Sequence, residues 1–460
     1  MLNTKLTPHR EYLLADTAGQ KLFLALSLRP DPDAAKTRPQ LAIAFVVDTS
    51  GSMREVVTEP TERTGQTTVV DGATYEVVRG AKSKIELVTE ALQGILGDDT
   101  LEDDDRIAIV GFDDQARVIA PFTPARERRR LQSSADTLGQ YSGGTRMGAG
   151  MREGLRLLSS ETGSRRMVLL TDGHTFDEDL VKSLVADLRA QRVSVTTVGV
   201  GDTNEDLLID LTDKTQGNLV DVVPDNQNPQ PPAVRASELP AAFLGDVKKA
   251  ASEVVTDLSL NVMTVRDVSI DRITRVYPVQ SEVEVGEQPF FLGSAAAGDE
   301  TVFVIEFTLP KRPPARMRLA QLGLSYQVPG ADYRGELPPM DVVVEFTNDE
   351  ARAAQIDPQV MQRVQQRNVE QLIKRATREA QTDPEQAAKT IALAKSMTVR
   401  LGNDVMTQAL DRAENELQSS KTISLNTAKT LKIGAKTQTL RMDQSDDLPS
   451  DDDIRKMTGA

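Results

Sequence analysis

Three short polar segments carry most of the residue types in this chain that could bind a ligand. They are Asp48-Thr49-Ser50-Gly51-Ser52, Gly143-Gly144-Thr145 and Thr171-Asp172-Gly173. Each is expected to follow a buried strand, which would place all three on loops at one edge of a sheet. Together they offer two carboxylates and three hydroxyls, which are oxygen ligands of the kind that hard divalent cations prefer. The predicted metal ligands are Asp48, Ser50, Ser52, Thr145 and Asp172.

The rest of the composition leaves few other kinds of site. The 460 residues include no Cys and only two His, which excludes a thiolate metal site, a disulfide framework and a histidine metal cage. His9 lies in a polar stretch and is expected to be a solvated side chain. His174 follows one of the three segments and is expected to be an exposed loop residue beside the site.

The charge and the hydropathy pattern narrow the range of partners. A formal net charge of −15 disfavours nucleic acid and anionic membrane surfaces as partners. The N-terminus has no apolar leader pattern, and no stretch approaches the roughly 20 apolar residues that a membrane helix needs. The chain is therefore expected to be soluble and cytoplasmic, unless a signal peptide has been removed from it.

Alternating apolar runs and helical patterns predict an α/β fold. Strands buried on both faces are indicated at 41–47, 107–112, 167–170 and 193–200. Apolar residues recur at helical spacing between these runs, at 83–96, 151–158 and 180–188. This order predicts a doubly wound, mostly parallel sheet within a domain at 40–254.

Two stretches of this domain differ from the regular pattern. The polar insertion at 55–82 holds an Asp71-Gly72 pair between β-forming residues, which indicates a hairpin standing beside the site. The Pro-rich residues 224–240 are expected to be a linker, before one more helix at about 241–254.

The remainder of the chain is expected to form three further parts. Alternating apolar residues at 255–347 predict an antiparallel β-sandwich, and the strand-like residues 1–39 are expected to join it. Proline residues after aspartate predict helix starts within 348–419, giving a helical hairpin or bundle with helices at about 358–380, 384–401 and 404–418. Residues 420–460 are rich in Thr and then in Asp, and they are expected to be a disordered tail.

The spacing of the predicted ligands suggests what the ion would do. Ser50 and Ser52 are two residues apart, so both hydroxyls can converge from one tight turn around Gly51. Neutral hydroxyl ligands leave a cation able to accept a further carboxylate from another molecule. The expected ion is Mg²⁺, with Mn²⁺ or Ca²⁺ as alternatives, and the expected role is metal-bridged protein recognition.

At these positions the sequence resembles a known family. Asp48-x-Ser50-x-Ser52, Thr145 and Asp172 are similar to the metal-ion-dependent adhesion site (MIDAS) of von Willebrand factor A (VWA) domains, over about 41–254. The wider layout resembles bacterial proteins of the calcium-activated-chloride-channel-like or stress-associated type. The resemblance implies binding of an acidic residue on a partner protein, without catalytic turnover. The inserted hairpin departs from the minimal domain and leaves partner access open.

Other functions stay open at this point. One is an accessory subunit of a MoxR-type or chelatase-like AAA+ ATPase on a separate chain, because no P-loop motif is present here. A metal-dependent hydrolase is the weaker alternative, because no general base adjoins the site. In the tail, candidate phosphorylation sites for a phosphothreonine-binding domain are Thr427, Thr430, Thr437 and Thr439. An aspartate of 443–453 is a further candidate ligand for the ion.

Overall fold

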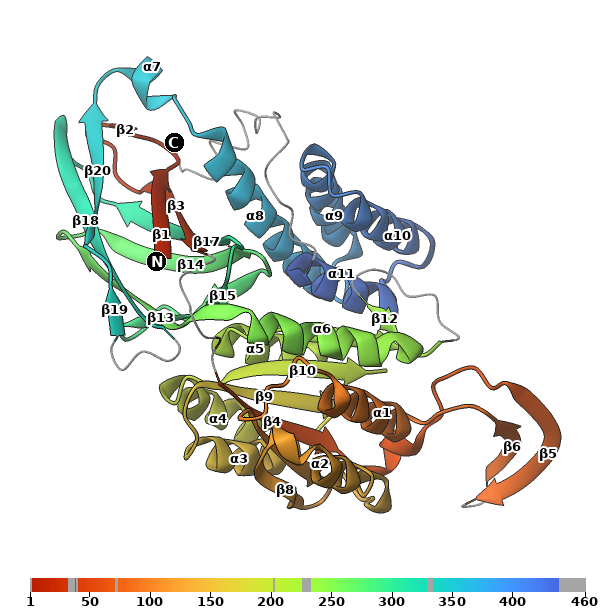
Figure 1. Cartoon of the computed structure of the whole chain (residues 1–460). Coiled ribbons are helices and arrows are strands. Elements are labelled where there is room, and N and C mark those ends of the chain that lie inside the picture. Colours follow the sequence, from red (N-terminus) through yellow and green to blue (C-terminus); the bar gives the residue numbers. More distant parts are fainter. Residues whose placement is uncertain are drawn as a thin grey trace. The chain divides into compact units, whose positions relative to one another are not determined.

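The computed structural model describes residues 2–31, 38, 40–70, 73–201, 203–225, 233–328 and 334–437. The chain divides into two compact units: Pro39–Ser252 is one, and Met1–Arg38 together with Glu253–Ala460 is the other. Figure 1 shows a sheet covered by helices in the first, and strands followed by helices in the second. The predicted fold class, an α/β sheet with a β-sandwich and a helical segment, is confirmed.

The first unit is built on a seven-stranded sheet in the order β12-β11-β10-β9-β4-β7-β8. All neighbouring pairs are parallel except β7 and β8, which are antiparallel. Every residue of the central strand β4 is buried, as its continuous apolar run predicts. The strands are β4 (Leu41–Asp48), β7 (Arg106–Phe112), β8 (Ala116–Pro124), β9 (Ser164–Thr171), β10 (Ser194–Val200), β11 (Leu219–Val223) and β12 (Val234–Arg235).

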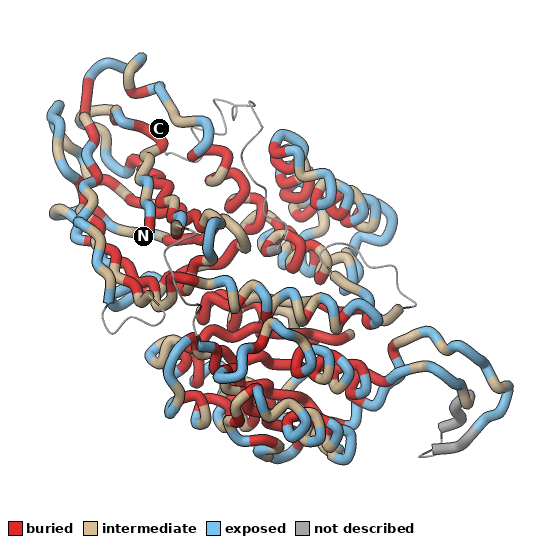
Figure 2. Tube along the Cα trace, in the orientation of Figure 1, coloured by how far each residue is buried: buried red, intermediate tan, exposed pale blue. Residues whose placement is uncertain are grey.

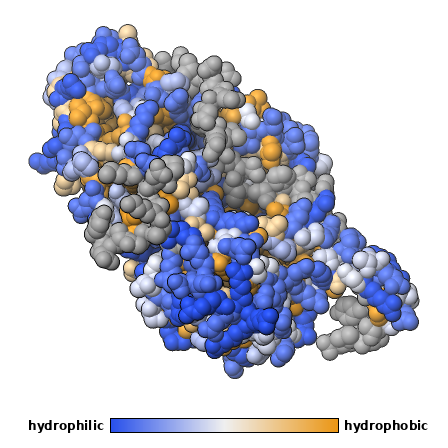
Figure 3. All heavy atoms as spheres, in the orientation of Figure 1, coloured by the Kyte–Doolittle hydropathy of each residue, from blue (hydrophilic) through white to orange (hydrophobic). Residues whose placement is uncertain are grey.

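Helices cover both faces of this sheet. Apolar residues of α1, α2 and α6 pack in the core on one face, and those of α3, α4 and α5 pack on the other. In Figure 2 the buried strands lie between helices whose outer sides are exposed, and Figure 3 shows a mostly hydrophilic surface on the same side of this unit. The helices are α1 (Lys84–Gly97), α2 (Arg128–Ala135), α3 (Met147–Leu158), α4 (Glu178–Ala190), α5 (Glu205–Thr215) and α6 (Leu239–Ala251).

Two stretches of this unit depart from the regular alternation of strands and helices in the sequence. The polar insertion contains the antiparallel pair β5 (Glu62–Val70) and β6 (Ala73–Arg79), and the Asp71-Gly72 turn lies outside the described residues. The prediction of a linker at 224–240 is wrong for its second half. β12 pairs with β11 there, and α6 begins at Leu239 after a short 3-10 turn. A two-residue edge strand is too short to produce a periodic signal.

The second unit begins with a β-sandwich of two sheets, in the orders β1-β3-β17-β14-β15 and β16-β13-β18-β20-β2. β3 from the N-terminal segment pairs with β17 along nine residues, and β2 pairs with β20. The apolar faces of both sheets form one core. The strands are β1 (Leu2–Pro8), β2 (Tyr12–Leu14), β3 (Gln20–Pro30), β13 (Glu253–Thr264), β14 (Ser269–Tyr277), β15 (Ser281–Val283), β16 (Phe290–Ala296), β17 (Thr301–Leu309), β18 (Ala315–Gln327), β19 (Arg334–Glu336), which pairs with β18, and β20 (Met340–Thr347).

Within the described residues, five helices follow the sandwich. Asp357 and Asp383 each cap a helix that starts with proline, accepting hydrogen bonds from the backbone N–H groups of Val360 and Gln386. The helices are α7 (Glu350–Ala353), α8 (Pro358–Glu379), α9 (Pro384–Arg400), α10 (Asp404–Ser420) and α11 (Leu425–Thr437). No helix within the described ranges is both long and apolar enough to cross a membrane.

The prediction of disorder from residue 420 onward is wrong for α11. Leu431 and Ile433 of this helix are buried, and Leu431 belongs to the core that α8, α9 and α10 share. Apolar residues occur at helical spacing here, but the many Thr and Lys residues obscured the pattern. Residues 438–460 lie outside the described part of the chain.

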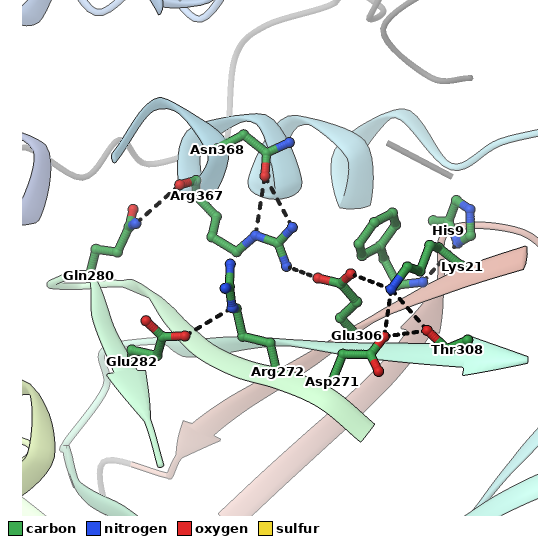
Figure 4. Close-up of polar contacts among 11 residues, drawn as sticks. His9, Lys21, Asp271, Arg272, Gln280, Glu282, Glu306, Thr308, Arg367 and Asn368 are labelled. Atoms are coloured by element: carbon green, nitrogen blue, oxygen red, sulfur yellow. Dashed lines mark hydrogen bonds and ion pairs between the residues drawn. The ribbon is translucent and has the colours of Figure 1, made fainter. Parts of the chain in front are cut away.

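A network of polar contacts joins α8 to the sheet beneath it (Figure 4). The buried Arg367 donates a hydrogen bond of 2.7 Å to Glu306 of β17, and its guanidinium carbon lies 5.3 Å from the ring centre of Phe23. Glu306 also pairs with Lys21 of β3 at 3.2 Å, and Lys21 pairs with Asp271 at 2.6 Å. Because one helix and three strands contribute, this network fixes where α8 lies on the sandwich.

The prediction that His9 is solvated is wrong. Its side chain is fully buried, packs edge-on against Phe23 and accepts a hydrogen bond of 3.1 Å from the Phe23 backbone N–H through Nδ1. The residue lies between β1 and β2, where folding brings β3 and the start of α8 around it. Burial, together with the nearby Arg10 charge, lowers the pKa of His9 to about 3.

The lowered pKa of His9 predicts that acid reduces the stability of the second unit. Between pH 6.5 and about 3 the unfolded chain binds a proton at His9 that the folded chain does not. This contribution to the free energy of unfolding is therefore intact above pH 6.5 and falls by about 1.4 kcal/mol per pH unit below it. Urea unfolding of wild type and His9→Asn from pH 7 to pH 5 should show a steeper loss in wild type. The same change at the exposed His174 is the control, and equal slopes for wild type and His9→Asn would contradict the prediction.

Candidate metal and ligand site

Two neighbouring strands bring the predicted carboxylates to one edge of the sheet. β4 and β9 are adjacent and parallel, with Val47 opposite Leu170. Asp48 is the last residue of β4, and Asp172 comes directly after β9. After Asp48 the chain turns into a short 3-10 helix, Gly51–Arg54. Ser50 and Ser52 therefore both lie just beyond the carboxyl end of β4.

A chain of hydrogen bonds connects four of the five predicted ligands. Asp48 Oδ1 accepts a hydrogen bond of 2.9 Å from the Ser50 N–H, and the hydroxyls of Ser50 and Ser52 are 3.1 Å apart. Ser52 Oγ in turn donates to Asp172 Oδ1 at 2.9 Å. On the other side, Thr171 Oγ1 donates to Asp48 Oδ2 at 2.9 Å. The side chains of Asp48, Ser50, Ser52 and Asp172 therefore form one continuous cluster.

The fifth predicted ligand, Thr145, lies on a loop that is joined to this cluster by the backbone. The Gly51 N–H donates to the Gly143 carbonyl at 3.0 Å, and the Thr145 carbonyl accepts from the Phe176 N–H at 3.0 Å. These bonds tie the loop both to the segment after β4 and to the segment after β9. Thr145 is half-buried.

This loop does not follow a strand, which corrects the sequence-based expectation. It comes after the 3-10 turn Leu138–Gln140 and leads into α3, because the chain passes through α2 after leaving the sheet at β8. Its two glycines have a steric role. A Cβ at Gly143 or Gly144 would lie 2.7 or 2.6 Å from a carboxylate oxygen of Asp114, which accepts a hydrogen bond from the Gly144 N–H.

Burial gives Asp48 an unusual electrostatic environment. Loss of solvent raises the pKa of Asp48 to about 6, and the nearby Asp172 charge adds to this, although hydrogen bonds from Ser50 and Thr171 act in the opposite direction. Two close carboxylates in a buried setting favour either a proton or a cation beside them. A bound cation would therefore stabilise the charged forms of Asp48 and Asp172.

Sequence reasoning missed one charged member of the site, Lys84. Its Nζ lies 2.9 Å from Asp172 Oδ2 and 2.5 Å from Glu55 Oε2, and its side chain is only 5% exposed. Burial lowers the pKa of Lys84, but hydrogen bonds and charges of Glu55 and Asp172 outweigh this and raise it, so the ammonium group stays charged. No spacing rule connects the first residue of α1 with the end of β9.

The donor set fits a hard divalent cation. The cluster offers carboxylate and hydroxyl oxygens without nitrogen or sulfur, which suits Mg²⁺, Mn²⁺ or Ca²⁺. Within the described ranges, no three His, Asp or Glu side chains group in a way that could hold a metal ion. A cation site here would therefore depend on hydroxyl ligands as well as on the two aspartates.

The rim of the site, meaning the residues close to the proposed ligands along the sequence, carries an exposed aromatic residue and two exposed arginines. Phe176 is 80% exposed, and its ring lies 3.1 Å from where a Cβ of Gly144 would be. Arg54, Arg146 and His174 are also exposed, and for His174 this agrees with the sequence-based expectation. Exposed apolar and arginine side chains thus occur close to the proposed ligands along the sequence, in a chain of strongly negative net charge.

The candidate phosphorylation sites lie mostly on an ordered helix. Thr427 is half-buried in α11 and donates a hydrogen bond of 2.6 Å to Glu416. Thr430 is half-buried in the same helix, and Thr437 is its last residue. Thr439 and the aspartates of 443–453 lie outside the described residues. A phosphate on Thr427 would be placed against the Glu416 carboxylate, which would oppose docking of α11.

Comparison with known proteins identifies two regions of the chain. Residues 42–230 match the von Willebrand factor type A domain family. Residues 358–441, a range that includes α11, match the Sll0103-like, C-terminal alpha-helical domain family. An uncharacterized protein of Synechocystis, sll0103, is 28% identical over 210 residues, and an uncharacterized protein of Borreliella burgdorferi is 26% identical over 127 residues. The matches span 45% and 27% of this chain, and 42% and 36% of those proteins.

Solved structures resemble the chain over almost its whole length. A von Willebrand factor type A protein from Catenulispora acidiphila has a TM-score of 0.73 at 16% identity, covering 96% of this chain and 97% of that one. The ArnB paralog VWA2 from Sulfolobus acidocaldarius has a TM-score of 0.60 at 14% identity, covering 96% and 99%. At these identities the likeness establishes the fold. Together with the family match, it shows that residues 42–230 of this chain are a von Willebrand factor type A domain.

Proposed function

We propose that this chain is a protein-binding scaffold that recognises an acidic residue of a partner through a Mg²⁺ ion held in its VWA domain. The observation that carries the proposal is the continuous cluster of Asp48, Ser50, Ser52 and Asp172 at the ends of β4 and β9. A VWA domain by itself favours a role in protein interaction or as a scaffold. The oxygen-only donor set of this cluster supports the more specific, metal-dependent form of that role.

The ion would be held by hydroxyl and carboxylate ligands from separate segments of the site. Ser50, Ser52 and Thr145 are the proposed hydroxyl ligands, and Asp48 and Asp172 the carboxylates that bind the ion or its waters. When bound, the ion would supply an open coordination position for a foreign carboxylate. Thr171 and the Ser50 N–H keep Asp48 oriented through its two oxygens. We propose no catalytic turnover, since nothing in this role requires a general base.

The rim favours a particular kind of partner surface. Arg54 and Arg146 would attract a negatively charged partner, and Phe176 offers a large apolar contact that is exposed in the described structure. Aromatic and arginine side chains dominate the binding energy of many interfaces. We therefore propose that the partner presents a carboxylate next to an apolar side chain.

The experiment that tests this function compares partner capture with and without the ion. Immobilised wild type and Asp48→Ala should be incubated with lysate in Mg²⁺ or in EDTA, and bound proteins quantified by mass spectrometry. We expect specific partners to be retained by wild type in Mg²⁺ only, and purified partners to lose binding when an acidic residue is replaced. Equal capture in EDTA, or by Asp48→Ala, would contradict the proposal.

The other roles remain predictions from the sequence. The described residues provide no specific observation that favours an accessory role beside an AAA+ ATPase, a phosphothreonine-dependent partner or metal-dependent hydrolysis. The likeness to calcium-activated-chloride-channel-like or stress-associated proteins and the cytoplasmic location also remain predictions.

A further inference from the structure

Backbone contacts at the base of the hairpin insertion, and a close approach to Gly201, hold Lys84 beside the proposed metal site. The hairpin insertion closes at its base, where Val56 pairs with Ser83 and the Lys84 N–H donates to the Glu55 carbonyl at 3.0 Å. The end of the lysine side chain runs beside Gly201, where a Cβ would lie 3.5 Å from Lys84 Cε. The ammonium group therefore reaches Asp172 from a fixed backbone rather than from a flexible surface position.

The charges of the site show what this ammonium group does. Asp48 and Asp172 together carry two negative charges, which would formally balance a divalent ion. Lys84 is hydrogen-bonded to Asp172 Oδ2, while Ser52 is hydrogen-bonded to Oδ1 of the same carboxylate. Asp172 is 1% exposed, so water screens its contact with the ammonium group only weakly.

We propose that Lys84 is a built-in cation that shares Asp172 with the divalent ion and thereby sets the net charge of the site. This inference rests on the proposed metal-dependent function. In the absence of the ion, Lys84 balances the buried Asp172. With the ion bound, the charges of the ion, the two aspartates and Lys84 sum to plus one, which weakens ion binding and favours a foreign carboxylate.

Glu55 adjusts this effect from the solvent side. Its carboxylate pairs with the same ammonium group, but its side chain is 66% exposed, so its charge is well screened. Removing the charge of Glu55 should leave more of the Lys84 charge acting on the site. Removing the charge of Lys84 and removing the charge of Glu55 should therefore change the affinity for the divalent ion in opposite directions.

The test is calorimetric titration of the full chain with Mg²⁺ and with Mn²⁺. We expect Lys84→Met to lower the dissociation constant at least tenfold, because a positive charge next to the ion is removed. Glu55→Gln should raise it two- to threefold, and this exposed substitution is not expected to disturb folding. Lys82→Met is the matched control, since Lys82 is exposed, lies two residues away and pairs with Glu90. It should leave the constant unchanged.

The outcomes separate this inference from the proposed function. If wild type binds the ion and Lys84→Met binds it equally or more weakly, the inference is overturned and Lys84 only orients Asp172. An increase in affinity for Glu55→Gln would also overturn it. If neither wild type nor any variant binds the ion, the proposed function itself fails. Binding by Lys84→Met but not by wild type would support the inference and contradict the metal-dependent function.

Discussion

Replacing Asp48 with asparagine is expected to weaken Mg²⁺ binding about a hundredfold, which corresponds to about 2.7 kcal/mol. The substitution removes one of the two negative charges of the site but keeps its size. The amide oxygen can still accept the hydrogen bond from the Ser50 N–H, and the amide nitrogen can donate to the Thr171 hydroxyl, so both contacts of the buried side chain can persist. Calorimetric titration gives the affinity, and circular dichroism confirms that the fold is retained.

Asp114→Asn is the matched control for this prediction. Asp114 is an exposed carboxylate close to the glycines before Thr145, and it is not among the proposed ligands. The Asp114→Asn variant should bind Mg²⁺ with the same affinity as wild type. If Asp48→Asn retained the wild-type affinity, or if Asp114→Asn lost as much, the proposed ligand set would be wrong.

The second large effect is expected in the helical domain, where replacing Glu370 with alanine should cost about 3–5 kcal/mol of stability. Glu370 of α8 is buried, with Oε1 2.7 Å from Lys374 Nζ and 3.2 Å from Lys436 Nζ of α11. Burial raises the pKa of this carboxyl, but the two lysine charges outweigh it and hold the pKa below its ordinary value. Truncation would leave the equally buried Lys436 ammonium group without this carboxylate.

Hydrogen exchange can locate this loss, because α11 should lose protection before α9 and α10 do. The double variant Glu370→Met with Lys436→Met should recover most of the stability, since a buried ion pair can be replaced by apolar residues at little cost. Arg375→Ala, which breaks an exposed pair with Glu379 on the same helix, is the control and should cost less than about 1 kcal/mol. A similar small loss in Glu370→Ala would show that the buried pair does not hold α11 in place.

The parts of the fold that the sequence predicts best are those where one residue pattern determines the structure. The apolar run at 41–47 is buried on both faces, and Asp-Pro pairs mark the starts of α8 and α9 within a residue. The proposed ligands Asp48 and Asp172 follow from the same logic, because the carboxyl ends of parallel strands meet at one edge.

The features that the sequence did not predict depend on contacts between distant segments. His9 is buried because β3 and the start of α8 close around it, and nothing in its own neighbours indicates this. Lys84 joins the site only because the base of the hairpin insertion brings it back to the end of β9. α11 is ordered by burial of Leu431 and by the contact of Lys436 with Glu370, which a Thr- and Lys-rich composition does not reveal.

The central claim, that oxygen ligands from separate loops hold one cation, can be tested directly with Mn²⁺. Crystals of the full chain grown in Mn²⁺ should give an anomalous scattering peak among the side chains of Asp48, Ser50, Ser52, Thr145 and Asp172. The peak should lie within about 2.0–2.6 Å of at least two of their oxygens, and it should be absent from Asp48→Asn crystals grown in the same way. Fully ordered loops without a peak at saturating Mn²⁺, or a peak elsewhere only, would contradict the account.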